Sequence, residues 1–147
     1  FSRLKFGIIK TMLNVNWIGI IVAGVVGMVV GAVWYGPLFG KQWSRLVGLT
    51  QEKMDEAKKK GMTQNYVIGL IGQLVTAYVL AYLIALTGSY SINVLVPLVF
   101  WVWLGLVMPM VLGGALWEGK PWKLVLLNGA YYIIVLMIMS FILIFLK

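Results

Sequence analysis

Four long apolar stretches constrain the fold of this chain more than any other feature of its sequence. They cover about 15–35, 65–87, 93–117 and 122–146, and the first two contain no Asp, Glu, Lys or Arg. A helix of about 20 apolar residues crosses a hydrocarbon layer roughly 30 Å thick. Each stretch is therefore predicted to be a transmembrane helix, tilted to fit its length. The expected fold is an all-α, four-helix polytopic membrane protein that forms one transmembrane domain over residues 1–147.

The overall composition agrees with a membrane protein. Of the 147 residues, 62% are hydrophobic and 11% are charged, and the mean hydropathy is +0.97. These values lie far outside the usual range of a soluble globular domain. The apolar runs also lack the alternation of apolar and polar residues that a membrane β-barrel requires. The lipid bilayer is therefore the expected surrounding of most of the chain.

Charge and residue usage exclude several classes of function. The net charge is +8, but the basic residues lie outside the apolar stretches or at their ends, which favours lipid headgroups over nucleic acid as the acidic partner. The chain has no Cys and no His, so it lacks thiol chemistry and the commonest metal ligand. No carboxylate pair lies within the spans and no phosphate-binding loop is present. We expect no enzymatic activity, no cofactor and no bound metal.

The distribution of basic residues predicts the orientation in the membrane. Four spans place loops 36–64 and 118–121 on one side and both termini on the other. The loop side, counted with Lys123, carries eight Lys or Arg residues, against four on the terminal side. Basic residues gather on the cytoplasmic side of membrane proteins. Both loops are therefore predicted to be cytoplasmic and both termini outside.

Two segments outside the spans have helical patterns. Residues 1–13 place apolar and basic side chains on different faces, which suits an amphipathic segment in the membrane interface. Residues 50–60 begin with Thr50 as an N-cap, place acids early and lysines late, and end at Gly61, so a short cytoplasmic helix is predicted there. This helix is either a docking surface for a partner or anionic lipid, or a solvated connector, and we favour the connector.

One motif occurs twice in the chain. The sequence "GAVWYGPLFGKQW" over 31–43 is answered by "GALWEGKPW" over 114–122, each at the end of an odd-numbered span. Such a repeat suggests two like-oriented helix hairpins related by a pseudo-two-fold axis along the membrane normal. Interfacial tryptophans and Gly-Pro helix ends could also produce the likeness without a duplication. The candidate motif residues are Trp34, Tyr35, Pro37, Lys41, Trp43, Trp117, Glu118 and Lys123.

The repeat makes a geometric prediction. Trp34 and Trp117 should lie at the same membrane depth, and Lys41 or Arg45 should approach Glu118 across the axis. Glu118 is the only acid outside the large loop. It is either a gate for protons or cations at the membrane rim or one member of a surface ion pair with a nearby lysine, and the ion pair is favoured.

Small residues recur every four positions in the first two spans. Such stripes let helices approach closely in lipid, where no hydrophobic effect draws them together. They serve either packing inside the bundle or a homo-oligomer interface, and we expect both uses. The helix-packing residues are Gly19, Ala23, Gly27 and Gly31 in the first span and Gly69, Ala77 and Ala81 in the second.

Polar and helix-breaking residues inside the spans are the usual pointers to function in membrane proteins. Interhelical hydrogen bonds are favoured over substrate contacts for the polar ones. Pro109 should kink the third span, because it cannot donate to the carbonyl of Gly105, and Gly105 should then face the bundle interior or a cavity. The candidate residues are Gln73, Gly105, Pro109, Asn128, Tyr131 and Tyr132, with Thr76, Tyr78, Tyr82 and Ser140 as further polar positions.

These residues carry a resemblance to a known family. The stretches "VNWIGIIVAGVVGMVVGAVWYGPLFGKQW", "GLTQEK" and "LWEGKPWKLVLLNGAYYIIVLMIMSFIL" resemble the prokaryotic integral membrane family catalogued as domain of unknown function 1761. The likeness extends from about Asn14 to the C-terminus. It implies a multi-pass protein of the cytoplasmic (inner) membrane of a bacterium or archaeon, and it implies no activity.

Two functional hypotheses follow. The favoured one is a non-enzymatic membrane protein that self-associates through its glycine stripes and forms a narrow permeation or transport path. The alternative is an accessory subunit that packs against a larger membrane complex and stabilises it. Purification from native membranes separates them, because a homo-oligomer supports the first and stoichiometric co-purification with a larger enzyme supports the second.

Cysteine labelling tests the predicted orientation. The native chain has no Cys, so each introduced thiol is unique. In intact cells an impermeant maleimide should label Ser2→Cys, on the outside, and leave Gln51→Cys unlabelled until the cells are opened. Labelling of Gln51→Cys in intact cells would reverse the orientation.

Overall fold

The structure is a computed structural model that describes residues 15–147. Four helices are long and apolar enough to cross a membrane: Trp17–Leu38, Thr63–Leu86, Ile92–Leu116 and Trp122–Phe145. The predicted all-α fold with four apolar helices is thus confirmed. The amphipathic segment predicted over 1–13 lies outside the described residues.

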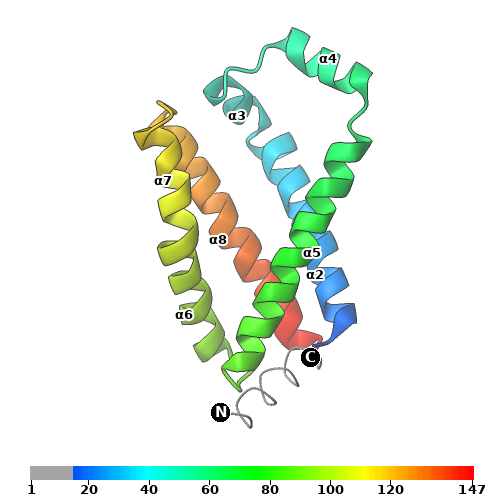
Figure 1. Cartoon of the computed structure of the whole chain (residues 1–147), viewed down its shortest axis with the longest axis vertical. Coiled ribbons are helices and arrows are strands. Elements are labelled where there is room, and N and C mark those ends of the chain that lie inside the picture. The colour runs from blue at the N-terminus through cyan, green and yellow to red at the C-terminus, as the bar shows by residue number, and fades with distance from the viewer. Residues whose placement is uncertain (1–14) are drawn as a thin grey trace.

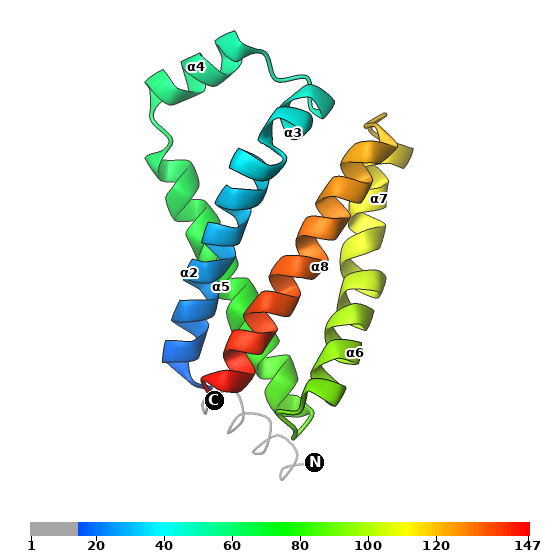
Figure 2. The ribbon, with the colours of Figure 1, turned by 180° about the vertical axis from the view of Figure 1, so that it is seen from behind.

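The four spans are built from seven elements (Figure 1). The first consists of α2 (Trp17–Val33) and η1 (Trp34–Leu38), and the second is α5 (Thr63–Leu86). The third consists of α6 (Ile92–Val102), η2 (Trp103–Val107) and α7 (Met108–Leu116), and the fourth is α8 (Trp122–Phe145). The first and third spans run in the same direction, so the chain forms two like-oriented hairpins (Figure 2).

Helix α8 is the centre of the bundle. It packs against α2, α5, α6 and α7. Half of its most apolar stretch (50%) is buried inside the protein, against 28%, 17% and 11% for the other three spans in chain order. The remaining apolar surface of those spans is exposed, as expected of side chains that face lipid. The bundle is therefore organised around its last helix.

The tightly packed core lies in the half of the bundle that holds the C-terminus, and the two hairpins separate toward the end that carries α7 and the large loop (Figure 1). The apolar core thus lies at one end of the bundle, and the hairpins are farther apart at the other. The core residues with little or no exposure are Ile20 and Ala23 of α2, Ala77, Leu80 and Ile84 of α5, Leu95 and Val99 of α6, and Val135 and Met139 of α8.

The small-residue stripes pack inside this bundle. A Cβ at Gly27 would lie 2.8 Å from Gln73 Oε1, and one at Gly31 would lie 3.0 Å from the Tyr131 hydroxyl. Gly19 and Ala23 are buried in the same way, and Ala77, Ala81 and Gly69 pack from the second span. The internal use of the stripes is confirmed. The chain itself covers the buried positions of the stripes, and self-association stays a prediction.

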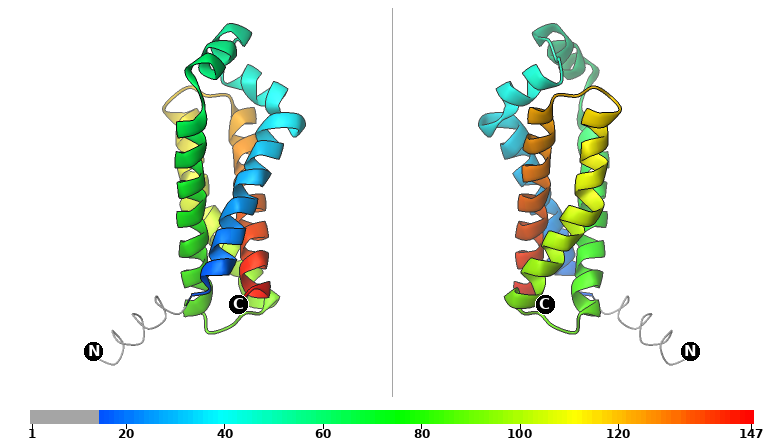
Figure 3. Two further views of the ribbon diagram at one scale, coloured as in Figure 1. Left: turned by 90° about the vertical axis from the view of Figure 1, so that its right-hand side faces the viewer. Right: turned by 90° about the vertical axis from the view of Figure 1, so that its left-hand side faces the viewer.

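Two π-helical segments interrupt the odd-numbered spans, and each accompanies a proline. Pro37 lies inside η1, where the Phe39 N–H donates to the Trp34 carbonyl over 2.9 Å. Pro109 follows η2 at the start of α7, and the third span changes direction between α6 and α7 (Figure 3). Proline cannot donate the α-helical bond, and the wider π turn supplies a different partner for the backbone. The predicted break near Pro109 is therefore present.

The expectation that Gly105 faces the bundle interior is wrong. Gly105 is exposed, and a Cβ placed on it would meet nothing within 4 Å. Successive residues are about 100° apart around a helix axis. Trp103 faces α8, so Gly105, two positions later, points away from it.

The large loop contains two short helices. The predicted one is α4 (Gln51–Lys60), where the Thr50 side chain accepts from the Lys53 N–H and Gly61 ends the helix at φ +82°. The sequence pattern does not predict the other, α3 (Gly40–Leu46), which begins within the repeated motif 31–43. The Ser44 hydroxyl donates to the Gly40 carbonyl within it, over 2.8 Å.

The close approach of the first two spans can be tested at Gly24. A Cβ there would lie 2.6 Å from Leu74 Cδ2 and 3.2 Å from the Leu74 Cα, so α2 and α5 would have to move apart. We expect Gly24→Ala to lower the free energy of unfolding by about 1–3 kcal/mol. Gly72→Ala on α5, where a Cβ meets nothing within 4 Å, should leave it unchanged or raise it. Unfolding in mixed micelles measures both, and equal losses would contradict this packing.

Candidate functional site

A cavity of about 490 Å³ lies between α5, α7 and α8. Helix α8 forms its back, and α5 and α7 form its two sides. These two sides do not pack closely against each other in the described part of the chain. The cavity therefore opens sideways between α5 and α7. Its polar lining residues are Gln73, Thr76, Asn128, Tyr131 and Tyr132, with Glu118 and Lys120 at the end near the 118–121 loop.

The inner end of the cavity is closed by the apolar core. Val135 and Leu136 line this end, and Met139, one turn further along α8, has no exposed surface. From there to the C-terminal end, the core residues of α5, α6 and α8 fill the bundle. The cavity thus reaches part of the way through the bundle and stops.

Two hydrogen bonds hold the helices together beside the cavity. The Tyr35 hydroxyl of η1 donates to Asn128 Oδ1 of α8 over 2.9 Å, and Gln73 Nε2 of α5 donates to the Tyr131 hydroxyl of α8 over 3.2 Å. The predicted role of Gln73, Asn128 and Tyr131 in interhelical hydrogen bonds is therefore confirmed. The same three side chains also line the cavity. These residues therefore both join the helices and face the space available to a ligand.

Aromatic rings surround the Tyr131 side chain. Tyr35 meets it edge-on with ring centroids 4.9 Å apart, and Tyr132 lies 5.2 Å away. Trp43 of α3 in turn meets Tyr35 at 5.6 Å. These contacts tie the end of the first span and the start of the loop to α8. Among the other motif residues, Pro37, Lys41 and Lys123 are exposed.

Two tryptophans, one from each π-helical segment, pack near the same stretch of α8. Trp34 begins η1 and lies 6.2 Å from the Tyr131 ring. Trp103 begins η2 and donates from Nε1 to the Gly129 carbonyl over 2.8 Å. Sequence reasoning missed Trp103. The available signal was the pattern Trp-x-Gly shortly before Pro, which occurs in "WYGP" and "WLGLVMP".

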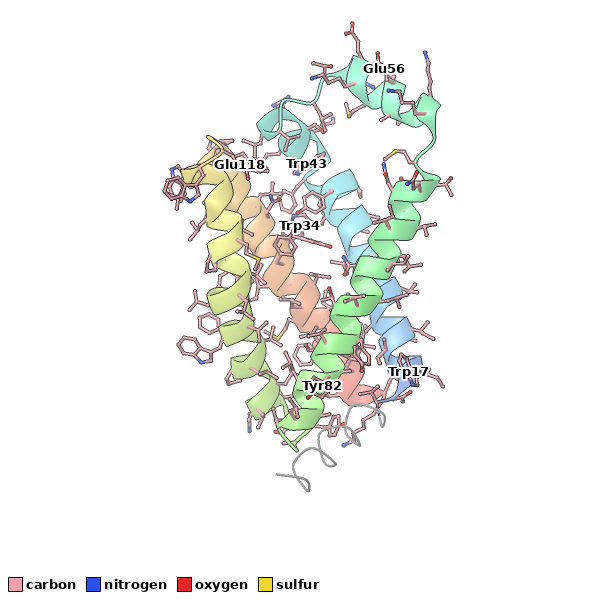
Figure 4. All side chains as sticks on the ribbon, in the orientation of Figure 1. Trp17, Trp34, Trp43, Glu56, Tyr82 and Glu118 are labelled. Carbon is pink, nitrogen blue, oxygen red and sulfur yellow. The ribbon has the colours of Figure 1, made fainter. Side chains whose placement is uncertain are left out.

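Trp34 and Trp117, the paired tryptophans of the repeated motif, have different surroundings, and their equal membrane depth stays a prediction. Trp34 is partly buried, and its indole nitrogen is enclosed without a hydrogen-bond partner in the described residues. Trp117 is 86% exposed. Figure 4 shows Trp34 between the hairpins, while Glu118 marks the outer end of the third span. The structural counterpart of Trp34 in the third span is Trp103.

Glu118 pairs with its near neighbour and not across the bundle. Its Oε2 lies 2.5 Å from Lys120 Nζ, and both side chains are at least half exposed. The expected approach of Lys41 or Arg45 to this carboxylate is absent from the ion pairs of residues 15–147. The interpretation of Glu118 as one member of a surface ion pair is confirmed. Within the same residues, no three His, Cys, Asp or Glu side chains gather as they would to hold a metal ion.

Comparison with known protein families matches residues 18–144 to one described as "Protein of unknown function (DUF1761)". The chain belongs to the DUF1761 family. The match covers nearly all of the four spans. It includes all of the residues that line the cavity. No curated protein and no solved structure matches the chain. Family membership thus confirms the resemblance without assigning an activity, and the prokaryotic origin stays a prediction.

Removal of the Tyr35 hydroxyl tests the hydrogen bond that joins η1 to α8. Tyr35→Phe keeps the ring contacts and deletes the donor to Asn128. We expect it to lower the free energy of unfolding by about 0.6 kcal/mol, the average for such bonds between membrane helices, and by no more than about 1.7 kcal/mol. Tyr82→Phe, whose hydroxyl has no hydrogen bond among the described residues, is the matched control. Equal effects of the two variants would contradict a role for this bond.

Proposed function

We propose that this DUF1761 protein is a non-enzymatic, multi-pass protein of a prokaryotic cytoplasmic membrane that holds a small molecule in the cavity between α5, α7 and α8. Binding there is one step of a transport path. The observation that carries this proposal is the cavity itself, with its polar lining inside a bundle that is otherwise apolar.

The size and lining of the cavity support binding. Small-molecule sites are concave, mostly apolar spaces of about 300–1,000 Å³ with a few polar groups that orient the ligand. The cavity volume of about 490 Å³ falls in this range. Gln73 and Asn128 contribute amides at membrane depth, where polar side chains are expensive and usually functional. The hydrogen bonds of Asn128 with Tyr35 and of Gln73 with Tyr131 account for the packing of these amides but leave the space beside them unexplained.

The closed inner end supports a one-sided state of a transport path. Ligand can enter beside α7 and α5, but the core around Met139 blocks passage to the other end. Transporters that expose a central site to one side at a time have this property. The distribution of basic residues predicts that the open end faces the cytoplasm. Self-association would have to use the exposed outer faces of the helices, because the small-residue stripes are occupied.

Thiol accessibility tests the cavity directly. Thr76 lines the cavity, whereas Val79, one turn away on α5, is 45% exposed on the surface expected to face lipid. In proteoliposomes a water-soluble methanethiosulfonate should modify Thr76→Cys at least tenfold faster than Val79→Cys. The reaction needs water and a thiolate, which lipid excludes. Water can reach Thr76 from the end of the cavity that carries the half-exposed Glu118 and Lys120, whereas Val79 faces lipid.

Sidedness is the second readout of the same experiment. Reagent on the side of loop 36–64 should modify Thr76→Cys, and reagent on the opposite side should react slowly, because the core intervenes. Equal and slow modification of both variants from both sides would remove the cavity as a binding site.

A further inference from the structure

We infer that the molecule bound in this cavity is an uncharged, membrane-soluble compound that presents carbonyl oxygens to α8. This inference rests on the proposed function and names the class of its ligand. It follows from the charges at the cavity, the hydrogen-bonding groups left free inside it, and the direction from which it opens.

The charges at the cavity exclude a charged ligand. The two ionised side chains in its lining, Glu118 and Lys120, neutralise each other at 2.5 Å and stand half exposed at its outer end. The lining further in is neutral. A charged group taken into such a site would lose its hydration without gaining a partner, which is unfavourable. The ligand must therefore be neutral where it enters.

Helix α8 presents hydrogen-bond donors to the cavity. The Asn128 oxygen is already occupied by the Tyr35 hydroxyl, which leaves the amide N–H groups free. The Tyr131 oxygen accepts from Gln73, so its own proton remains available. The Tyr132 hydroxyl lines the cavity and makes no hydrogen bond within residues 15–147. Three side chains on one face of α8 thus offer donors, and the matching ligand group is an acceptor such as a carbonyl oxygen.

The opening between α5 and α7 admits ligand from the bilayer. Val107, Met110 and Val111 form the apolar wall on the third span, and Met110 is 80% exposed at its edge. An apolar body would contact this wall while its carbonyl end reaches the donors of α8. Two membrane-soluble sources share this chemistry, a planar quinone ring and the ester groups of a glyceride.

Native mass spectrometry of the detergent-solubilised protein distinguishes these sources. The probes are 2-methyl-1,4-naphthoquinone, 1,2-dioctanoylglycerol and, as a control without carbonyl groups, 2-methylnaphthalene. We expect one of the two carbonyl compounds to form a saturable one-to-one complex at least tenfold tighter than the control. A complex with the naphthoquinone assigns the site to planar quinones, and a complex with the glyceride assigns it to esters.

Matched variants show whether the donors and the cavity are responsible. Tyr132→Phe should weaken the complex about three- to tenfold, as loss of one hydrogen bond does, while Tyr82→Phe, outside the cavity lining, should not. Thr76→Phe should abolish the complex by filling the cavity, while Val79→Phe on the same helix should not. Tyr131→Phe gives a second test of the donors that keeps the ring packing.

Three results would overturn the inference. They are equal binding of 2-methylnaphthalene, binding of neither carbonyl compound, and unchanged affinity in both Tyr132→Phe and Tyr131→Phe. If thiol reagents reach Thr76→Cys while neither carbonyl compound binds, only the ligand class is wrong. If they do not reach it, the proposed function fails as well.

Discussion

The packing of α8 against every other span is the interaction on which the rest of the structure depends. Lipid provides no hydrophobic force to hold helices together, so close packing and a few hydrogen bonds must do so. Helix α8 supplies both. Its C-terminal half contributes Val135 and Met139 to the core, and its N-terminal half accepts hydrogen bonds at Asn128, Tyr131 and the Gly129 carbonyl. Helix α8 thus contributes apolar packing at one end of the bundle and hydrogen-bonding groups at the other.

The π-helical segments explain how the odd-numbered spans meet α8. A proline in a membrane helix leaves a carbonyl without its usual donor, and in lipid this carbonyl must find another partner or face a protected space. In η1 the backbone adapts by a longer-range bond between Phe39 and Trp34. The added residue per turn also rotates the helix, so that Trp34 and Trp103 both point toward α8. The prolines therefore affect where aromatic side chains point as well as where the helix bends.

Hydropathy and capping chemistry were enough to predict the four spans and α4, but not α3, the π-helical segments or the rotation of each helix about its own axis. The four spans follow from runs of apolar residues, and α4 follows from Thr50 and Gly61. Gln73, Asn128 and Tyr131 were recognisable as polar residues in lipid, yet their meeting at one cavity depends on helix rotation, which no local pattern encodes. The same limit explains why Gly105 points away from the bundle, and why Trp117 is almost fully exposed whereas Trp34 is partly buried.

The asymmetry between the two ends of the bundle connects stability with function. A perfect pseudo-two-fold arrangement would pack the second span against the third as closely as the first packs against the fourth. Instead α2 packs along α8, while α5 and α7 stand apart with the cavity between them. Filling that space with apolar side chains would add packing without disturbing the core around Met139. The chain instead places amides and hydroxyls there, and in a bilayer such an arrangement is favourable only when these groups find hydrogen-bond partners.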